Sequence, residues 1–284
     1  MRISGARAVI ECLREQGVDT VFGYPGGMVL PLYDALYAAP DIRNILTVHE
    51  QGAAHAADGY ARASGRVGVC LATSGPGATN LLTGLAAAFM DSVPVVAITG
   101  QVPTKLIGSD SFQEVDIVGM SMAITKHNGQ VKKVEQLPAI MRQAFKIARS
   151  GRPGPVLVDI PRDVQTALTE YEPEPVPEPP VWQPEADTAG LIAKAAAAIS
   201  KARRPVIVAG GGVISAGAHA ELRQLADKCR LPVVNTLMGL GAFPASHPQA
   251  LGLTGLHGHR TANETVHNSD VIIAAGCNYH IGIM

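Results

Sequence analysis

The chain has 284 residues, of which 47% are hydrophobic, and a formal net charge of −1 at pH 7. This length allows one large or two medium domains with a sizeable core. The balanced charge and the lack of a basic block argue against binding to nucleic acid or to an anionic membrane. The apolar runs are too short to cross a bilayer, and the first residues lack the apolar core of a signal peptide.

The four cysteines carry no disulfide or metal signature. Cys12, Cys70, Cys229 and Cys277 are far apart and form no Cys-x-x-Cys pair. Such spacing is typical of reduced, buried thiols, so we expect a cytoplasmic protein.

The first part of the chain alternates predicted helices and strands. Ser4 suits the N-cap position of the first helix. Helices separated by strands predict a parallel sheet that is covered on both faces. Helices are predicted over residues 4–16, 29–38, 50–65, 77–90 and 135–149, and strands over 20–23, 45–48, 67–73, 93–99 and 155–160, with 45–48 expected to be buried.

A second α/β segment follows a stretch rich in proline and glutamate. Residues 169–187 cannot continue a helix or a central strand, which predicts an extended linker and a domain boundary. After the linker, helices are predicted over 188–201, 216–229 and 262–267, and strands over 205–209, 232–235 and 270–275. The last strand has no helix after it, so we expect an unfinished second domain.

A carboxylate stands where a predicted strand gives way to a helix. Glu50 follows the apolar run 45–48 and precedes a segment of many alanines that ends at Gly65. Ligands of parallel α/β sheets bind at the carboxyl ends of strands, so Glu50 is a candidate functional residue. Position alone leaves an equally good alternative, because a carboxylate at a helix N-terminus complements the helix dipole by about 1 kcal/mol or less. The alanines would let a backbone or a flat ring come close.

Two glycine-rich turns follow predicted strands in the same way. Tyr24-Pro25-Gly26-Gly27 exposes backbone N–H groups, although by itself it fits an ordinary turn better. Thr73-Ser74-Gly75-Pro76-Gly77-Ala78-Thr79-Asn80 is a strand–turn–helix segment that could face an anion with helix N–H groups. It lacks the Lys of a Walker A loop.

Together these segments resemble thiamine-diphosphate enzymes, in particular the acetolactate synthase large subunit. The resemblance implies that Glu50 is catalytic, because its counterpart contacts the cofactor's aminopyrimidine ring and promotes the tautomer that removes the thiazolium proton. Met28 is bulkier than the alanine expected after the first turn. The resemblance also implies that Gly27 lines the substrate site and that Tyr24, Pro25, Gly26, Glu50, Thr73, Pro76 and Asn80 bind the cofactor.

The rest of the first domain keeps the same resemblance. Segments 101–103, 112–116 and 125–128 occur in the order typical of acetolactate synthases. The resemblance implies that Gln113 is catalytic near the thiazolium and that Phe112 contacts substrate. Arg152 matches an arginine that contacts FAD, for which a guanidinium offers paired donors. Arg162 stands where the family usually has a substrate-side lysine, so the charge is kept but the geometry differs.

The second domain resembles the FAD-binding central domain of the same family. Its triple glycine alone is weak evidence, because the Gly-x-Gly-x-x-Gly spacing with a downstream acidic residue is not met. His259 replaces a common threonine, and residues 276–278 lack a flavin-contacting arginine. His257 and His259 have no further ligand set beside them, so no metal site is predicted in this chain. The residues implied to bind FAD are Gly210, Gly211, Gly212, Thr236, Leu237, Met238, Leu256 and His257.

The implied architecture is α/β throughout. A flavodoxin-like, parallel-sheet domain that binds the pyrimidine half of the cofactor spans residues 1–168, the linker 169–187, and a partial Rossmann-like central domain 188–284. The resemblance covers about half of a full large subunit. The chain contains no Gly-Asp-Gly motif, with which the family holds the diphosphate through Mg²⁺. The atypical last nine residues, 276–284, fit a truncated or frame-shifted product that is inactive alone.

The implied function is the condensation of two pyruvates, or of pyruvate with 2-oxobutyrate, with release of carbon dioxide in isoleucine and valine biosynthesis. The family implies a homodimer and a regulatory small subunit as partners. Three alternatives stay open: another thiamine-diphosphate carboligase or 2-oxoacid decarboxylase, a non-catalytic remnant that dimerises through the Glu50 helix, and a nicotinamide dehydrogenase that rests only on the triple glycine.

Overall fold

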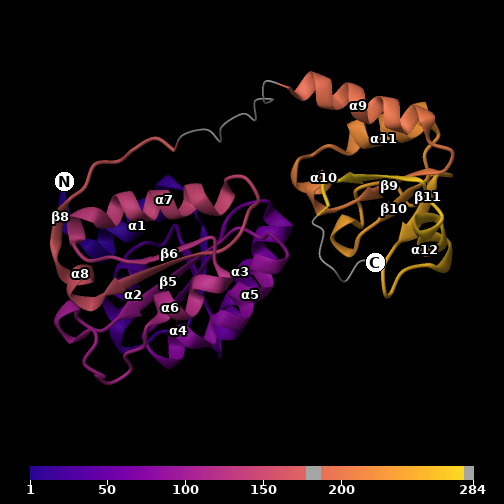
Figure 1. Cartoon of the computed structure of the whole chain (residues 1–284). Coiled ribbons are helices and arrows are strands. Elements are labelled where there is room, and N and C mark those ends of the chain that lie inside the picture. Colours follow the sequence, from indigo (N-terminus) through magenta and orange to yellow (C-terminus); the bar gives the residue numbers. More distant parts are fainter. Residues whose placement is uncertain (177–186, 278–284) are drawn as a thin grey trace. The chain divides into compact units, whose positions relative to one another are not determined.

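The computed structural model describes residues 1–176 and 187–277, which belong to two units (Figure 1). The first unit is Met1–Pro180 and the second Val181–Met284, and each has its own sheet and apolar clusters. The division falls inside the predicted linker, whose residues 177–186 lie outside the described part. Residues 278–284 of the atypical C-terminal segment lie outside it too. The domain boundaries at 168 and 188 stay predictions.

The first unit is organised around a six-stranded sheet in which every neighbouring pair is parallel. This confirms the predicted parallel α/β fold. In spatial order its strands are β3 (Arg43–Leu46), β2 (Thr20–Gly23), β4 (Gly68–Ala72), β5 (Val95–Gln101), β7 (Val156–Pro161) and β6 (His127–Gln130).

Helices cover both faces of this sheet (Figure 1). α1, α2 and α7 pack on one face, and α3 and α5 on the other, as expected for strands connected by helices. The helices are α1 (Gly5–Glu15), α2 (Leu30–Tyr37), α3 (Glu50–Ser64), α4 (Pro76–Asn80), α5 (Leu82–Met90), α6 (Ile117–Ser121), α7 (Leu137–Arg149) and α8 (Arg162–Thr166), with 3-10 turns η1 (Gly27–Val29), η2 (Thr104–Leu106), η3 (Met122–Ile124) and η4 (Val134–Gln136).

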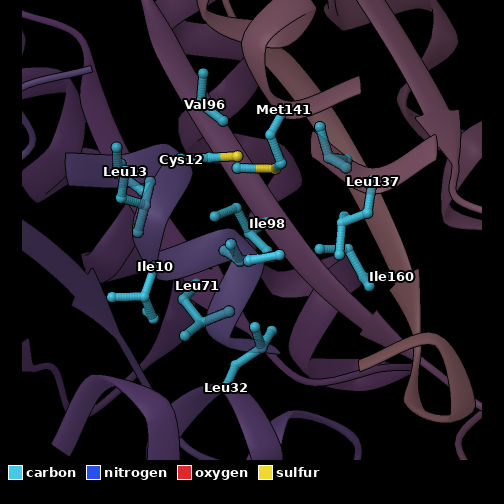
Figure 2. Packing of buried hydrophobic residues seen from close by; sticks show 14 of the residues in the cluster. Ile10, Cys12, Leu13, Leu32, Leu71, Val96, Ile98, Leu137, Met141 and Ile160 are labelled. Atoms are coloured by element: carbon cyan, nitrogen blue, oxygen red, sulfur yellow. The ribbon is translucent and has the colours of Figure 1, made fainter. Parts of the chain in front are cut away.

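The larger core lies between the sheet and helices α1 and α7. Ile10 and Leu13 of α1 face Ile98 of β5 and Met141 of α7 in Figure 2, and all four side chains are buried. The predicted cap of α1 is confirmed, since the Ser4 hydroxyl accepts a hydrogen bond from the Arg7 amide. Burial of each such aliphatic side chain contributes roughly 1.5–3 kcal/mol, which fixes the helices on the sheet.

The prediction of a buried strand over residues 45–48 is wrong. The strand is β3, Arg43–Leu46, and it forms an edge of the sheet with all four residues exposed. Val48, just beyond it, is 99% exposed. An apolar run has the same pattern in a central strand and in an edge strand, so the run could not distinguish them.

Three strands of the first unit were not predicted. β6 (His127–Gln130) has no apolar run, and β1 (Arg2–Ser4) and β8 (Leu168–Glu170) form a short antiparallel pair. β8 begins the segment predicted as a linker, and Tyr171 after it is only 1% exposed. The start of that segment is therefore part of the first unit.

The second unit contains a four-stranded parallel sheet. The predicted helix over 188–201 and strand over 205–209 are confirmed with those bounds, whereas β11 and α10 were missed. The strands in spatial order are β11 (Ala250–Leu253), β10 (Val233–Asn235), β9 (Pro205–Ala209) and β12 (Val271–Ala275), and the helices are α9 (Thr188–Lys201), α10 (Gly211–Ser215), α11 (His219–Cys229) and α12 (Arg260–His267), with η5 (Leu237–Gly239). Among residues 1–176 and 187–277, no helix has both the length and the apolar character needed to span a bilayer.

Candidate cofactor site

Most of the predicted site residues of the first unit follow strands at one edge of its sheet. The turn 24–27 comes directly after β2, the turn 73–77 after β4, the loop 102–116 after β5, and Arg162 after β7. Because these strands are parallel, their carboxyl ends meet at the same edge. The topology therefore brings these candidate segments to one edge of the sheet, where ligands of parallel α/β sheets bind.

Glu50 is the first residue of α3 and is buried, with 9% of its surface exposed. Its Oε2 accepts a hydrogen bond of 3.0 Å from Nδ2 of Asn80, at the end of α4. The preceding residue, His49, is the N-cap, and its Nδ1 accepts from the Gln51 amide at 3.1 Å. A buried carboxylate needs a donor to offset its lost hydration, so Asn80 fixes the orientation of Glu50.

Glycines let the two turns close around Glu50. A Cβ atom on Gly77 would lie 2.7 Å from Cγ2 of Thr73 and 3.2 Å from Oε1 of Glu50. A Cβ atom on Gly26 would lie 2.5 Å from the Thr73 side chain. The Thr73 hydroxyl also accepts from the Met28 amide at 3.2 Å, which joins the two turns. Any larger residue at either glycine would push these segments apart.

Gln113 belongs to the same cluster through its backbone. A Cβ atom on Gly75 would lie 2.6 Å from the carbonyl oxygen of Gln113, so the loop 102–116 packs directly on the turn after β4. Both residues have positive φ, +59° in each case. The neighbouring Phe112 is 84% exposed. The structure thus brings Gln113 to the Glu50 cluster and leaves Phe112 at its surface.

Two buried hydroxyls near this cluster have no hydrogen-bond partner in the described part of the chain. They are Tyr33 Oη and Ser74 Oγ. The Tyr33 hydroxyl lies where a Cβ atom on Gly23 would come within 2.5 Å of it. Burial raises the pKa of Tyr33, and the charge of Glu50 raises it further, so the phenol stays a neutral donor.

The sequence did not single out either hydroxyl. Ser74 stands inside the turn motif 73–80, which could have suggested it, whereas Tyr33 gives no local signal because its approach to Glu50 depends on the packing of α2.

The donor set suits a neutral, flat ring that carries an amino group. It offers one buried carboxylate, the amide that binds it, two hydroxyls without a partner in the described residues, and glycines at 26, 75 and 77 that leave the turns without side chains. Within residues 1–176 and 187–277, no group of three His, Cys, Asp or Glu side chains could hold a metal ion. The residues present therefore fit the aminopyrimidine half of thiamine diphosphate.

The two arginines predicted from the resemblance lie at opposite edges of the sheet. Arg152 precedes β7, at the opposite edge of the sheet, where it donates to Ser92 Oγ (2.7 Å) and to the carbonyl of Met90 (3.1 Å). It thereby binds the C-terminus of α5, as a cation should. Arg162 begins α8 at the same edge as Glu50, with an exposed side chain.

The glycine-rich residues of the second unit also collect at the carboxyl edge of their sheet. A Cβ atom on Gly211 would lie 3.1 Å from Met238, and the Gly212 amide donates to the Gly276 carbonyl at 2.9 Å. Thr236 caps η5 through its hydroxyl. The residues Gly210–Gly212, Thr236 and Met238 are thus close together, whereas the side chains of Leu237, Leu256 and His257 are exposed.

Comparison with known families agrees with this geometry. Residues 3–120 match the family described as "Thiamine pyrophosphate enzyme, N-terminal TPP binding domain", and residues 192–281 match "Thiamine pyrophosphate enzyme, central domain". The chain belongs to the thiamine pyrophosphate enzymes. The matched N-terminal region of this family contains Glu50, Thr73, Asn80 and Gln113, and the central region contains the triple glycine.

Similar proteins are named as acetolactate synthases. A "Probable acetolactate synthase large subunit" of Methanocaldococcus jannaschii is 56% identical over 98% of this chain and 47% of its own length. The "Acetolactate synthase large subunit" of Corynebacterium glutamicum is 50% identical over 98% and 45%. "Acetolactate synthase isozyme 3 large subunit" of Escherichia coli is 50% identical over 98% and 49%. The chain spans about half the length of these relatives.

Proposed function

We propose that this chain is the N-terminal half of an acetolactate synthase large subunit and binds the pyrimidine half of thiamine diphosphate at Glu50. The observation that carries the proposal is the buried Glu50 carboxylate, which accepts from Asn80 and lies against Gly77. The relatives that cover the whole chain at 50–56% identity support the choice of acetolactate synthase among enzymes of this family.

The residues have distinct tasks in this proposal. Thiamine diphosphate, when bound, supplies the carbon that stabilises the acyl anion of a 2-oxo acid. Glu50 holds a proton shared with a ring nitrogen, and its burial makes that interaction stronger than in water. Asn80 keeps the carboxylate in place. Gln113 acts beside the ring, and Gly27, Phe112 and Arg162 face the 2-oxo acid, whose carboxylate suits a guanidinium.

The remaining cofactors and partners belong to the same proposal. FAD would bind the second unit at the cluster around Gly210–Gly212, and Arg152 is proposed separately as a flavin contact. Mg²⁺ would come with the diphosphate-binding segment. A homodimer and a regulatory small subunit are the proposed partners. The central domain is proposed to begin at residue 188, whereas the first domain extends past the predicted end at 168, because β8 and Tyr171 pack in the first unit.

A complementation experiment tests the proposal. The chain is mixed with the part of the Methanocaldococcus jannaschii relative that has no counterpart in this chain. Thiamine diphosphate, Mg²⁺, FAD and pyruvate are added. We expect acetolactate from the mixture and none from the isolated chain, because a few pyrimidine contacts do not offset the cost of immobilising the cofactor. Glu50→Gln should lower the rate of the mixture roughly 10²- to 10⁴-fold.

The matched control is Glu221→Gln, which removes an exposed carboxylate from the first turn of α11 and should leave the rate unchanged. Robust acetolactate formation by the chain alone would contradict the proposal. So would equal rates for the Glu50→Gln and wild-type mixtures.

A further inference from the structure

Asp159 is a fully buried carboxylate in the middle of the first unit's sheet. It lies on β7 with none of its surface exposed. Three side chains donate to it: Thr99 Oγ1 at 2.7 Å, Gln130 Nε2 at 2.8 Å and Gln101 Nε2 at 3.2 Å. Thr99 and Gln101 come from β5 and Gln130 from β6, so the carboxylate joins three adjacent strands. The mechanism above makes no use of it.

Gln101 extends this network into the loop 102–116. Its Nε2 donates not only to Asp159 but also to the carbonyl of Val115 at 2.9 Å. Its Oε1 accepts from the Val102 amide at 3.0 Å. The Gln101 side chain thus contacts both ends of the loop. Asp159 fixes its orientation, because an ionised carboxylate only accepts hydrogen bonds and so faces the Nε2 donor of Gln101 rather than its Oε1 acceptor.

The loop is braced internally and rests on the cofactor site. Glu114 accepts from the amides of Gly108, Ser109 and Ser111, so the outer part of the loop is tied together. The backbone of Gln113 packs on Gly75. A shift at the two ends of the loop would therefore reach the turn that lies against Glu50.

We propose that Asp159 is a positioning residue, which acts through Gln101 to hold the loop 102–116, and with it Gln113, against the Gly75 turn of the cofactor site. This inference rests on the proposed function, in which Gln113 acts beside the cofactor ring. The contacts themselves form a continuous series from Asp159 through Gln101 and Val115 to Gln113 and Gly75.

Burial adds a second property to this residue. Desolvation raises the pKa of Asp159 to about 6, while the hydrogen bonds from Gln130, Thr99 and Gln101 oppose the shift and the charge of Asp116, the N-cap of α6, adds to it. The ionised form accepts the three donors, so lowering the pH through about 6 should loosen the loop.

The test is amide hydrogen exchange on the chain as it stands, without substrate. Asp159→Asn keeps the side-chain volume but turns an amide donor toward Gln101. We expect exchange in 108–116 to become roughly 10- to 100-fold faster, the factor that follows from losing one hydrogen bond to a charged group. Asp58→Asn is the matched control, because Asp58 is also buried but binds Arg62. It should leave exchange in the loop unchanged.

Two further measurements separate positioning from general destabilisation. The double variant Asp159→Asn with Gln101→Leu should exchange no faster in the loop than Gln101→Leu alone. In the unmodified chain, the NMR shifts of the Gln113 and Gly75 amides should follow a titration near pH 6 that Asp58→Asn retains. Equal acceleration in α1 and in the loop, additive effects, or no such titration would overturn the proposal.

None of these readouts uses acetolactate formation. The positioning role and the enzymatic function can therefore fail separately.

Discussion

At the scale of single residues, the candidate site is centred on a buried carboxylate group, that of Glu50. Glu50 has a donor in Asn80, and Gly77 leaves no side chain against its Oε1 atom. Burying a polar group is costly unless it is hydrogen-bonded, so the hydrogen bond from Asn80 stabilises the fold around Glu50.

Removing that donor should be measurable in the fold itself. Asn80→Ala leaves the buried Oε2 of Glu50 without its partner, and we expect unfolding of the first unit to become easier by about 1 to 3 kcal/mol. Urea denaturation followed by circular dichroism measures it. Asn44→Ala, on the exposed strand β3, should cost much less, and equal losses would show that the hydrogen bond contributes little.

Asp159 should give the first unit an unusual dependence on pH. Its folded pKa, about 6, lies above the ordinary value of 3.8, so between these values the folded state binds more protons than the unfolded state. Stability from this residue is therefore full below about pH 4 and is lost as the pH rises through 6, by up to about 3 kcal/mol. Relative to wild type, Asp159→Asn should lack this loss in urea titrations between pH 4 and 7. Asp58→Asn, which leaves Asp159 in place, should retain it.

At the scale of elements, the turn after β4 is the point where strand, helix and loop meet. Gly75 has a positive φ and lies against the Gln113 backbone, whereas Gly65 at the end of α3 has a positive φ and open space around it. The two glycines share a positive φ but differ in ψ, 7° at Gly65 and −121° at Gly75, so alanine at Gly75 meets its own backbone strain as well as the contact with Gln113.

Alanine at the two positions should show this difference. Gly65→Ala should destabilise the fold by about 1 to 2 kcal/mol, the cost of the left-handed conformation. Gly75→Ala adds a collision with Gln113 and should cost a further 1 to 3 kcal/mol or so. Thermal unfolding of both variants measures the difference, and similar losses would mean that the loop does not press on the turn.

The elements that could be predicted are those whose own residues carry the pattern of a helix or a strand. α1 was predicted because its buried positions recur with the period of a helix, and β2 because a short run of residues precedes the turn 24–27. β6 was missed because His127–Gln130 has no apolar residue and is a strand only through its pairing with β7. The exposure of β3 was missed because being at the edge is a property of the sheet, not of the strand.

The site divides in the same manner. Glu50, Thr73 and Asn80 could be found from motifs, since each follows a strand or lies in a glycine-rich turn. Tyr33 and Asp159 could not, because their importance comes from neighbours that are distant in sequence. An aspartate inside the apolar run 155–160 was the available signal for Asp159: a charge buried in a strand demands partners.

At the scale of the whole molecule, the two units have separate cores. Their apolar clusters share no residue: Ile98 belongs to a cluster of the first unit and Ile207 to one of the second. Separate cores of this kind are expected to unfold as separate cooperative units.

Core truncations should reveal this independence. Ile207→Ala, at a fully buried position of the second unit, should destabilise that unit by about 2 to 5 kcal/mol and leave the first unit's transition in place. Ile98→Ala should do the reverse. Hydrogen exchange resolved by peptide assigns each effect to its unit. A common shift of both transitions in either variant would instead mean that the units unfold together.

The pairing of β1 with β8 brings the two ends of the first unit's fold side by side. The N-terminal ammonium of Met1 donates to the Tyr171 carbonyl at 2.8 Å, so the polypeptide enters and leaves this unit at one point. Such closure lets a folded unit be circularly permuted or inserted into another protein through short tethers. The order in which the segments of this unit are encoded could therefore change while the groups around Glu50 keep their places.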